Sequence, residues 1–458
     1  MTPGPAAADD RPLMAPGKGP MTTAIAVVVA MVAAACVKGT GGQPGVSDSP
    51  TIGWAGQELF GIPNDWEPAV AADPNAPYVY MLTTRYGEPA ACDGCPDKWI
   101  AMRTSSDGGK TFADPEYLCA CKGEKWQADP NIEVAGDGTV FATWLTTGYD
   151  VVTTRSTDHG ATWTKPKSVI GNLPWGDHPW TTVSADGRDV YIGFNRRDNY
   201  QVTSHDTGVH WSQPIQTNES DDNTYYFSEG GVVLPDDTAV FAASSYGCCP
   251  YGKFAHKRPQ TVYAIRSEDG GNTWEQVEIA TSEAPPLCTG DGCPKAQYGA
   301  QATVAADRNG NLIMAWNASA EPHGGQQILA ATSSDGGATW SEPQELSPPG
   351  DLVAAFPEAA GLGEKLSLMW ADNRSGEHLF NIWYRESVDG GSTWSPDVRL
   401  SDAEAAPEFA DYISPEGFGF FYGDYGDITV TNQGKAFGVW GESGGYNGPG
   451  TTWYNWQT

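Results

Sequence analysis

The chain has 458 residues, which is enough for one large all-β domain or two domains of ordinary size. It carries 26 Lys and Arg against 57 Asp and Glu, and the resulting formal net charge of −31 argues against nucleic acid and anionic membrane surfaces as partners. This charge favours neutral, cationic or metal-bridged ligands. The 55 Gly and 34 Pro suit many short strands and turns, and the 18 Trp and 19 Tyr supply bulky side chains for packing between sheets.

The N-terminus contains an apolar run, Ala24–Ala35, that follows Lys18. This run is too short to span a bilayer and has the length of a signal-peptide core. It ends in Ala-Ala-Ala-Cys, which resembles a bacterial lipobox with Cys36 as the lipidated residue. We therefore expect residues 1–36 to direct export and residues 37–50, rich in Gly, Ser and Pro, to form a flexible tether. The folded domain is expected at 51–458, in a cell-envelope lipoprotein that touches the membrane only through its lipid, or in a secreted protein.

A short motif then recurs six times along the chain. The copy at Ser333–Trp340 reads SSDGGATW, and all six fit Ser-x-Asp-x-Gly-x-(Thr or His)-(Trp or Phe). The aspartates, which lie 51, 48, 63, 66 and 54 residues apart, are Asp107, Asp158, Asp206, Asp269, Asp335 and Asp389. A repeat of this length is one supersecondary unit used many times. The carboxylate can accept backbone N–H groups and hold a turn, the glycine can adopt a positive φ, and the closing aromatic residue can anchor the next strand. We interpret these aspartates as structural.

The motif resembles the Asp box, or bacterial neuraminidase repeat, of the sialidase superfamily, and this resemblance implies a β-propeller. The sequence around each box agrees. Within Asp129–Leu145 two alternating apolar segments flank an Asp-Gly turn, a third strand leads into the Asp box, and a fourth follows at Lys165–Gly171. Four antiparallel strands per repeat, with no helical periodicity, are typical of a propeller blade.

Six blades are predicted from these repeats, and a seventh from the C-terminal segment. The first six are Asn64–Leu118, Lys125–Gly171, Trp175–Thr217, Tyr225–Ala280, Tyr298–Ser347 and Leu352–Ser401. The seventh has three strands, at Asp427–Val430, Ala436–Glu442 and Thr451–Gln457. We expect Ile52–Phe60 to supply its outer strand and close the ring, because closure removes exposed sheet edges. Sialidases of known type have six blades, so six is the alternative to the favoured seven. The long loops between second and third strands and between blades are predicted to share the face opposite the Asp boxes.

Eight cysteines fall on this loop-rich face, in four close pairs. They are Cys92 and Cys95, Cys119 and Cys121, Cys248 and Cys249, and Cys288 and Cys293. The first two pairs flank the first blade and the last two flank the fourth. An even number in an exported protein predicts disulfides within each group of four. Two zinc sites with four thiolate ligands each are the alternative.

Candidate ligand-binding residues follow from aligning the inner strands, which begin near the central channel. The aligned positions are Glu67, Asp129, His178, Glu229, Gln301, Glu358 and Tyr425, with Trp66 and Trp126 nearby. Carboxylates that accept hydroxyl hydrogen bonds, mixed with aromatic faces, suit a sugar or a cation, and a carboxylate pair can hydrolyse a glycoside. Glu229, Tyr425 and Asp129 are the catalytic candidates; the ligand-binding candidates are Glu67, His178, Glu358, Arg196, Arg374, Trp66 and Trp126. Alternatively, the acids cap strands or hydrogen-bond to neighbouring blades.

The sialidase resemblance also implies three arginines that clamp a carboxylate, a Tyr–Glu nucleophile pair and an Asp acid/base. The first family arginine sits in a Phe-Arg-Ile-Pro motif at the start of the first blade, where this chain reads NDWEPAV (Asn64–Val70) without an arginine. Arg85, Arg196, Arg197 and Arg374 could form a clamp near the ends of second strands, and Glu229 with Tyr425 could be the nucleophile pair.

Three functions remain open from the sequence. The first is an exported, lipid-anchored propeller that recognises a glycan or other polar ligand on its cysteine-braced face, with or without glycoside hydrolysis. The second is an exo-glycosidase of sialidase type, and the third is a non-catalytic scaffold that binds a protein. We predict no cofactor, although the acidic rim could hold a structural cation such as calcium, and we expect a monomer.

Overall fold

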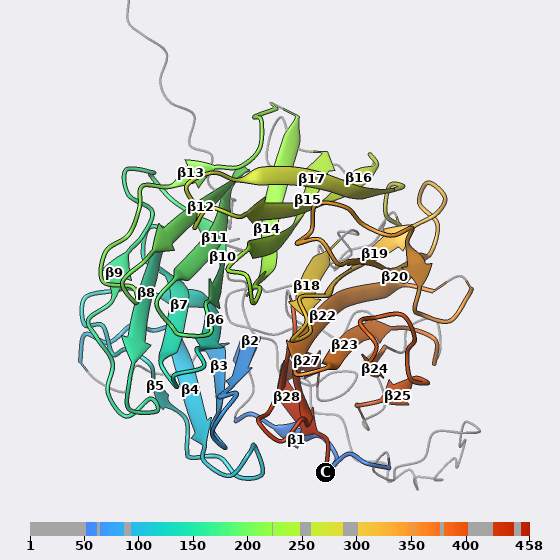
Figure 1. Cartoon of the computed structure of the whole chain (residues 1–458). Coiled ribbons are helices and arrows are strands. Elements are labelled where there is room, and N and C mark those ends of the chain that lie inside the picture. Colours follow the sequence, from blue (N-terminus) through green and yellow to red (C-terminus); the bar gives the residue numbers. More distant parts are fainter. Residues whose placement is uncertain are drawn as a thin grey trace, which may run out of the picture.

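The computed structural model describes residues 52–61, 65–86, 93–221, 223–247, 258–286, 301–350, 352–375, 380–401, 425–443 and 450–458. Within these ranges every regular element is a β-strand, and the strands form seven four-stranded antiparallel sheets around a common axis (Figure 1). A search of the same ranges found no membrane-spanning helix. The predicted signal peptide, lipidation site and tether lie outside the described residues.

Each blade is one sheet whose strands follow chain order from the axis outward, except the last. The first three blades are β2–β5 (Asp65–Ala72, Val79–Arg85, Trp99–Ser105, Glu116–Tyr117), β6–β9 (Gln127–Val134, Val140–Thr146, Asp150–Ser156, Lys167–Ser168) and β10–β13 (Asp177–Val183, Val190–Arg196, Asp198–Ser204, Ile215–Gln216). The next three are β14–β17 (Thr224–Val233, Ala239–Gly247, Gln260–Ser267, Glu275–Ser282), β18–β21 (Ala302–Ala306, Leu312–Ser319, Gln326–Ser333, Gln344–Glu345) and β22–β25 (Ala354–Leu362, Lys365–Asp372, Asn381–Ser387, Val398–Arg399).

The seventh blade joins the two ends of the folded domain. It has the order β1-β28-β27-β26, with β1 at Glu58–Leu59, β26 at Asp427–Val430, β27 at Ala436–Ser443 and β28 at Gly450–Trp456. In β1, Glu58 pairs with Tyr454 and Leu59 with Trp453, and the backbone N–H of Phe60 donates to Thr452 at 2.9 Å. Both the seven-blade count and the closing N-terminal strand are thereby confirmed.

Packing between blades is dominated by large side chains on the second strands. The indoles of Trp144 in β7, Trp316 in β19, Trp370 in β23 and Trp440 in β27 are all fully or almost fully buried. Each lies in a cluster that combines residues of neighbouring blades. Truncating one such side chain to alanine would lower the free energy of unfolding by about 3–5 kcal/mol, so these tryptophans contribute much of the stability of the ring.

The Asp boxes are compact hydrogen-bonded turns between third and fourth strands. In the fifth blade, Asp335 Oδ1 accepts the Ser333 hydroxyl at 2.8 Å and the Thr339 backbone N–H at 2.9 Å, while Oδ2 accepts the Thr339 hydroxyl at 2.6 Å. Gly337, with a φ of +79°, donates its N–H to Ser333 Oγ at 3.0 Å. The threonine and serine hydrogen bonds lower the pKa of Asp335 to about 2. These contacts use the whole carboxylate within the turn, as expected of a structural residue.

Side chains near the axis join neighbouring blades at five junctions. Asp427 Oδ2 accepts the N–H of Val70 at 2.8 Å, and Gln301 Oε1 accepts the N–H of Phe356 at 3.2 Å. Three further junctions use the same arrangement: Glu67 with Asp129 N–H, Asn131 with Thr181 N–H, and Glu229 with Ala302 N–H. A buried backbone N–H without an acceptor is costly, so these contacts stabilise the inner ring.

One disulfide is described in full, between Cys119 and Cys121 after the fourth strand of the first blade. It falls within the first predicted group of four, and Cys95 is also disulfide-bonded. The remaining cysteines, Cys92, Cys248, Cys249, Cys288 and Cys293, lie outside the described residues.

Candidate functional site

The inner strands carry a repeated backbone irregularity where they approach the axis. In β2, β6, β10 and β22 the register with the second strand slips, and the extra residue has a positive φ: Glu67 (55°), Asp129 (50°), His178 (47°) and Phe356 (52°). Each is followed by a proline, which disfavours helical-type backbone in the residue before it. Strain of this kind costs about 1–3 kcal/mol per residue and tends to persist at functional sites, and a bulge re-aims the side chain of its extra residue. The four positions therefore mark the candidate site, which we call the channel mouth.

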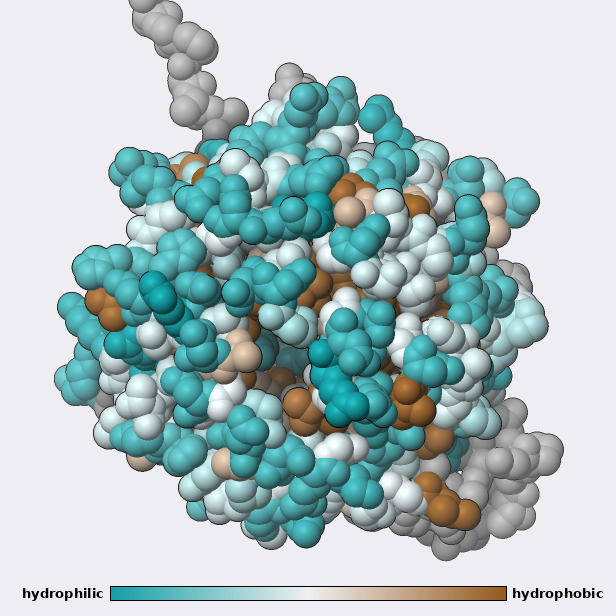
Figure 2. Space-filling model, viewed as in Figure 1, coloured by the Kyte–Doolittle hydropathy of each residue, from teal (hydrophilic) through white to brown (hydrophobic). Residues whose placement is uncertain are grey.

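His178 lies at the centre of an aromatic group drawn from several blades. Its ring centroid is 5.3 Å from that of Tyr425, 5.8 Å from Trp180 and 5.9 Å from Phe227. Tyr425 immediately precedes the seventh blade, whereas His178 belongs to the third, so these contacts bring distant blades together. The face shown in Figure 2 is hollowed near the axis, with hydrophilic and hydrophobic residues around the recess.

The imidazole of His178 is held in one protonation state by its surroundings. Nδ1 lies 3.0 Å from the carbonyl oxygen of Ser228, which can only accept, so Nδ1 carries the proton and Nε2 the lone pair. Burial lowers the pKa of His178 to about 4. A neutral imidazole with a fixed tautomer can accept a ligand hydroxyl hydrogen bond or a proton.

Two carboxyl groups from different blades, Glu67 of blade 1 and Asp177 of blade 3, interact beside this histidine. Glu67 is buried; its Oε1 accepts the Tyr86 hydroxyl at 2.7 Å and its Oε2 the Asp129 N–H at 3.1 Å. Asp177, which the sequence did not single out, is half-buried and hydrogen-bonded to the Tyr225 hydroxyl. Burial, together with the charge of Glu67, raises the pKa of Asp177 to about 6. Two carboxyl groups in different environments are the arrangement that general acid and base chemistry requires.

A second aromatic platform lies beside Asp129. The rings of Trp126 and Tyr149 meet edge to face at 5.1 Å, and the ammonium of Lys98 lies 5.0 Å from the Trp126 ring and 4.9 Å from the Tyr86 ring. Burial and the charges of Asp177 and Asp129 raise the pKa of Tyr149. Tyr149 therefore lies within the field of both aspartates, and the half-buried Trp126 offers a face on which a sugar could stack.

Deeper carboxylates belong to the ring itself. Glu229 is 6% exposed; Oε1 accepts the Ser244 hydroxyl at 3.2 Å and Oε2 the Ala302 N–H, and burial raises its pKa to about 8. Burial and the charge of Asp427 raise the pKa of Glu133 to about 8, while burial alone raises that of Asp427 to about 7. The described contacts of Glu229 are thus structural, and those of Tyr425 are with His178 and Trp180.

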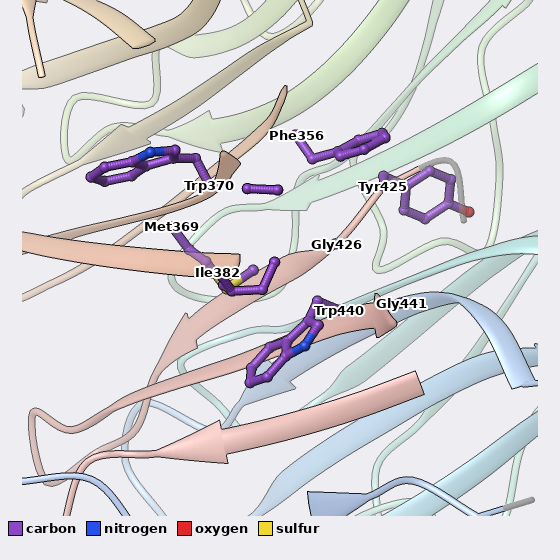
Figure 3. Close-up of a pocket in the computed structure, with 9 residues that line it drawn as sticks. Phe356, Met369, Trp370, Ile382, Tyr425, Gly426, Trp440 and Gly441 are labelled. Atoms are coloured by element: carbon purple, nitrogen blue, oxygen red, sulfur yellow. The ribbon is translucent and has the colours of Figure 1, made fainter. Parts of the chain in front are cut away.

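Other predicted residues differ in position from the sequence alignment. Trp66 is fully buried, so it packs in the core and does not reach a ligand. Glu358 lies two residues beyond the bulge position of blade 6, which Phe356 occupies; burial and the charges of Asp427 and Glu229 raise its pKa well above the ordinary value. Phe356 and Tyr425 lie together at one end of a small apolar pocket between blades 6 and 7 (Figure 3).

The four arginines considered for a carboxylate clamp each have other contacts. Arg85 makes two hydrogen bonds, of 2.6 and 2.7 Å, with the fully buried Asp65. Arg374 pairs with Asp372 and Asp397 and stacks on Trp383 at 3.8 Å. Arg196 lies over Trp175 at 5.2 Å, and Arg197 donates to the Asp221 carbonyl at 3.2 Å. The four guanidinium groups belong to blades 1, 3 and 6, and each binds different partners.

The residues that the sequence analysis missed, Asp177, Tyr225, Tyr149, Tyr86 and Lys98, left only weak signals. Asp177 adjoins His178, and Pro68, Pro130, Pro179 and Pro357 mark the bulges. A proline inside an inner strand is unusual and could have shown where strand alternation breaks.

Comparisons with known proteins agree with this architecture. A BNR repeat-like domain matches residues 180–355. A sialidase of Bacteroides fragilis (strain YCH46) is 25% identical over 299 residues, which are 55% of this chain and 49% of that protein, so the match spans about half the length of this relative. An ulvan lyase, a polysaccharide lyase, superposes with a TM-score of 0.53 at 12% identity over 88% of this chain and 95% of its own. The Hadza microbial sialidase Hz136 gives a TM-score of 0.46 at 13% identity over 88% and 94% of the two chains.

The repeats, the seven blades and these matches define the chain as an Asp-box β-propeller. This fold and its repeats resemble those of the sialidase superfamily. The structural likenesses concern the fold alone, because the identities are low.

Proposed function

We propose that this chain is an exported, lipid-anchored propeller that binds a glycan at the channel mouth and hydrolyses a glycosidic bond there. The observation that carries the proposal is the pairing of Asp177 and Asp129 around Tyr149, beside the half-buried Trp126. Relatives and neighbours named as a sialidase and an ulvan lyase support a glycan as the ligand. The Cys119–Cys121 disulfide is consistent with an oxidising compartment.

The two aspartates have different environments, and this difference suggests their roles. Burial and the charge of Glu67 raise the pKa of Asp177 to about 6, so Asp177 retains a proton that it can donate to the leaving-group oxygen. Asp129 is the partner carboxylate that attacks the anomeric carbon or activates water. Glu67 is a positioning residue, because it accepts the N–H of Asp129 and its charge acts on Asp177.

A panel of fluorogenic glycosides tests this function. We expect Asp177→Asn to lower kcat by about 10²-fold or more with a smaller change in KM, as is usual when a general acid is removed. The wild-type rate should fall as the pH rises above about 6, because Asp177 then loses the proton that it donates. Glu345→Gln, at an exposed site on the outer strand of blade 5, is the matched control. A wild type that turns over no glycoside and binds no glycan on an array would instead favour the protein-binding scaffold.

A polysaccharide lyase is the second candidate, and one observation favours it. The neutral His178, with Nδ1 bonded to the Ser228 carbonyl, leaves Nε2 free of a proton and able to abstract one from the carbon beside a uronate carboxylate. The ultraviolet absorbance of an unsaturated uronate product separates the two reactions, because hydrolysis produces none.

A further inference from the structure

We propose that the channel mouth selects glycans carrying free amino groups over neutral glycans, and neutral glycans over acidic ones. This inference rests on the proposed function and names the substrate class of the same site. It departs from the sialic acid that the names of several related proteins suggest, and it follows from the balance of charges at the mouth.

The negative charge of the mouth comes from three successive blades. Glu67, Asp129 and Asp177 lie on β2, β6 and β10. Glu67 accepts a hydrogen bond from the backbone N–H of Asp129, and its charge acts on Asp177. Asp129 and Asp177 are both half-buried, so a ligand could reach them. Since the fields of three carboxylates overlap here, a ligand carboxylate would meet repulsion and a ligand ammonium would meet attraction.

Among the described residues, most positive groups on this side of the ring already have other partners. Arg196 lies over the Trp175 ring, and Arg197 lies beside Asp221. Arg85 and Arg374 are already neutralised by Asp65 and by Asp372 with Asp397. Lys98 contributes one ammonium, held between the rings of Tyr86 and Trp126, against the three carboxylates.

The raised pKa of Asp177 agrees with an excess of negative charge at the mouth and predicts how ligand affinity changes with pH. The groups that face Asp177 are Glu67 from β2, Tyr149 from the turn between β7 and β8, Tyr225 from β14 and the adjacent neutral His178. Burial and Glu67 raise the pKa of Asp177 to about 6, so Asp177 holds a proton below about this pH and adds a negative charge above it. A bound ammonium would favour the ionised form and expel that proton. While the ligand amino groups remain protonated, amino-glycan affinity should therefore rise with pH through about 6, and acidic-glycan affinity should fall.

Isothermal titration calorimetry with three matched probes tests the proposal. The probes are tetramers of glucosamine, N-acetylglucosamine and galacturonic acid, titrated at physiological ionic strength below and above pH 6. We expect the glucosamine tetramer to bind about tenfold tighter than the N-acetylated one at the higher pH, as for one partly desolvated charge pair. We expect the galacturonate tetramer to bind most weakly. Proton release on glucosamine binding should appear as a dependence of the heat on buffer ionisation enthalpy.

Two variants separate a local effect from attraction by the whole acidic protein. Asp177→Asn should abolish most of the tenfold preference, whereas Glu345→Gln should leave both affinities unchanged. Asp129→Asn serves the same purpose if the first variant does not fold. Tighter binding of the galacturonate tetramer than of the neutral one, or a preference that survives in both aspartate variants, would overturn the inference while leaving glycan binding intact. Absence of binding by all three probes would overturn the proposed function as well.

Discussion

Replacing Glu229 by glutamine should make the protein more stable at alkaline pH without loss of glycan binding. The Glu229 side chain bridges blades 4 and 5 through the Ala302 N–H and the Ser244 hydroxyl. A glutamine can keep both contacts, because its carbonyl oxygen accepts the N–H and its amide group donates to the serine oxygen. The difference between the two proteins is then the charge that glutamate acquires and glutamine does not.

The size of this effect follows from the pKa of Glu229, which burial raises from 4.5 to about 8. Below pH 4.5 both native and unfolded states hold the proton. Between the two values only the native state holds it, so the free energy of unfolding falls as the pH rises. At about 1.4 kcal/mol per pH unit, the loss is about 3 kcal/mol at pH 7 and approaches 5 kcal/mol above pH 8. The glutamine variant does not lose this free energy of unfolding, because its side chain cannot ionise.

Urea denaturation followed by tryptophan fluorescence, at pH 5, 7 and 9, measures the difference. We expect the two proteins to agree within about 1 kcal/mol at pH 5 and the variant to be more stable by about 3–5 kcal/mol at pH 9. Glu133 and Asp427 titrate in the same direction, so only the difference between curves reports on Glu229. Parallel curves, or a glutamine variant several kcal/mol less stable at pH 9, would refute the reasoning.

Three further predictions concern the scaffold. Phe60→Ala truncates a fully buried side chain beside the closing strand β1 and should lower the free energy of unfolding by about 3–5 kcal/mol. Val388→Ala, at a side chain that is 66% exposed, should change this free energy by less than about 0.5 kcal/mol in the same denaturation assay. Equal effects of the two substitutions would contradict the role of the closing strand. Asp335→Ala removes the hydrogen bonds of one turn and should cost about 1–2 kcal/mol, and an unchanged midpoint would argue against the Asp box as a stabilising element. Peptide mapping without reduction should recover Cys119 linked to Cys121, and free thiols in the native protein would disprove this disulfide. Replacing both cysteines by serine should lower the free energy of unfolding by only about 1–2 kcal/mol, because the disulfide closes a very short loop.

The fold was largely predictable because its determinants are local. Within eight residues, such as Ser333–Trp340, the sequence supplies the hydroxyl, carboxylate, glycine and aromatic residue that make one hairpin turn. Repetition of this turn marks six of the seven blades, and the three strands at the C-terminus indicate the seventh. The closing strand was also predictable, since three strands at the C-terminus left one position open and Ile52–Phe60 was the unassigned strand-like segment.

The channel mouth was less predictable because its geometry depends on irregular backbone. A bulge adds one residue and shifts every later side chain to the other face, so strand alternation alone does not place residues beyond it. The sequence alignment found the bulge positions Glu67, Asp129 and His178 but placed Glu358 where Phe356 lies, and it counted the fully buried Trp66 among the residues near the mouth. The role of Asp177 depends on the charge of Glu67 from another blade, which no local pattern reveals.

The pairing of β1 with β28, which closes the ring in the seventh blade, has a mechanical consequence. Glu58 and Tyr454 are paired although almost the whole domain separates them along the chain, so the ring cannot close until both ends are present. Any pull on the polypeptide ahead of residue 52 is transmitted first to the hydrogen bonds of residues 53–56 with residues 455–458 and then to the two-residue strand at Glu58–Leu59. Under load, the ring should therefore open first where β1 pairs with β28, while the remaining six sheets stay intact.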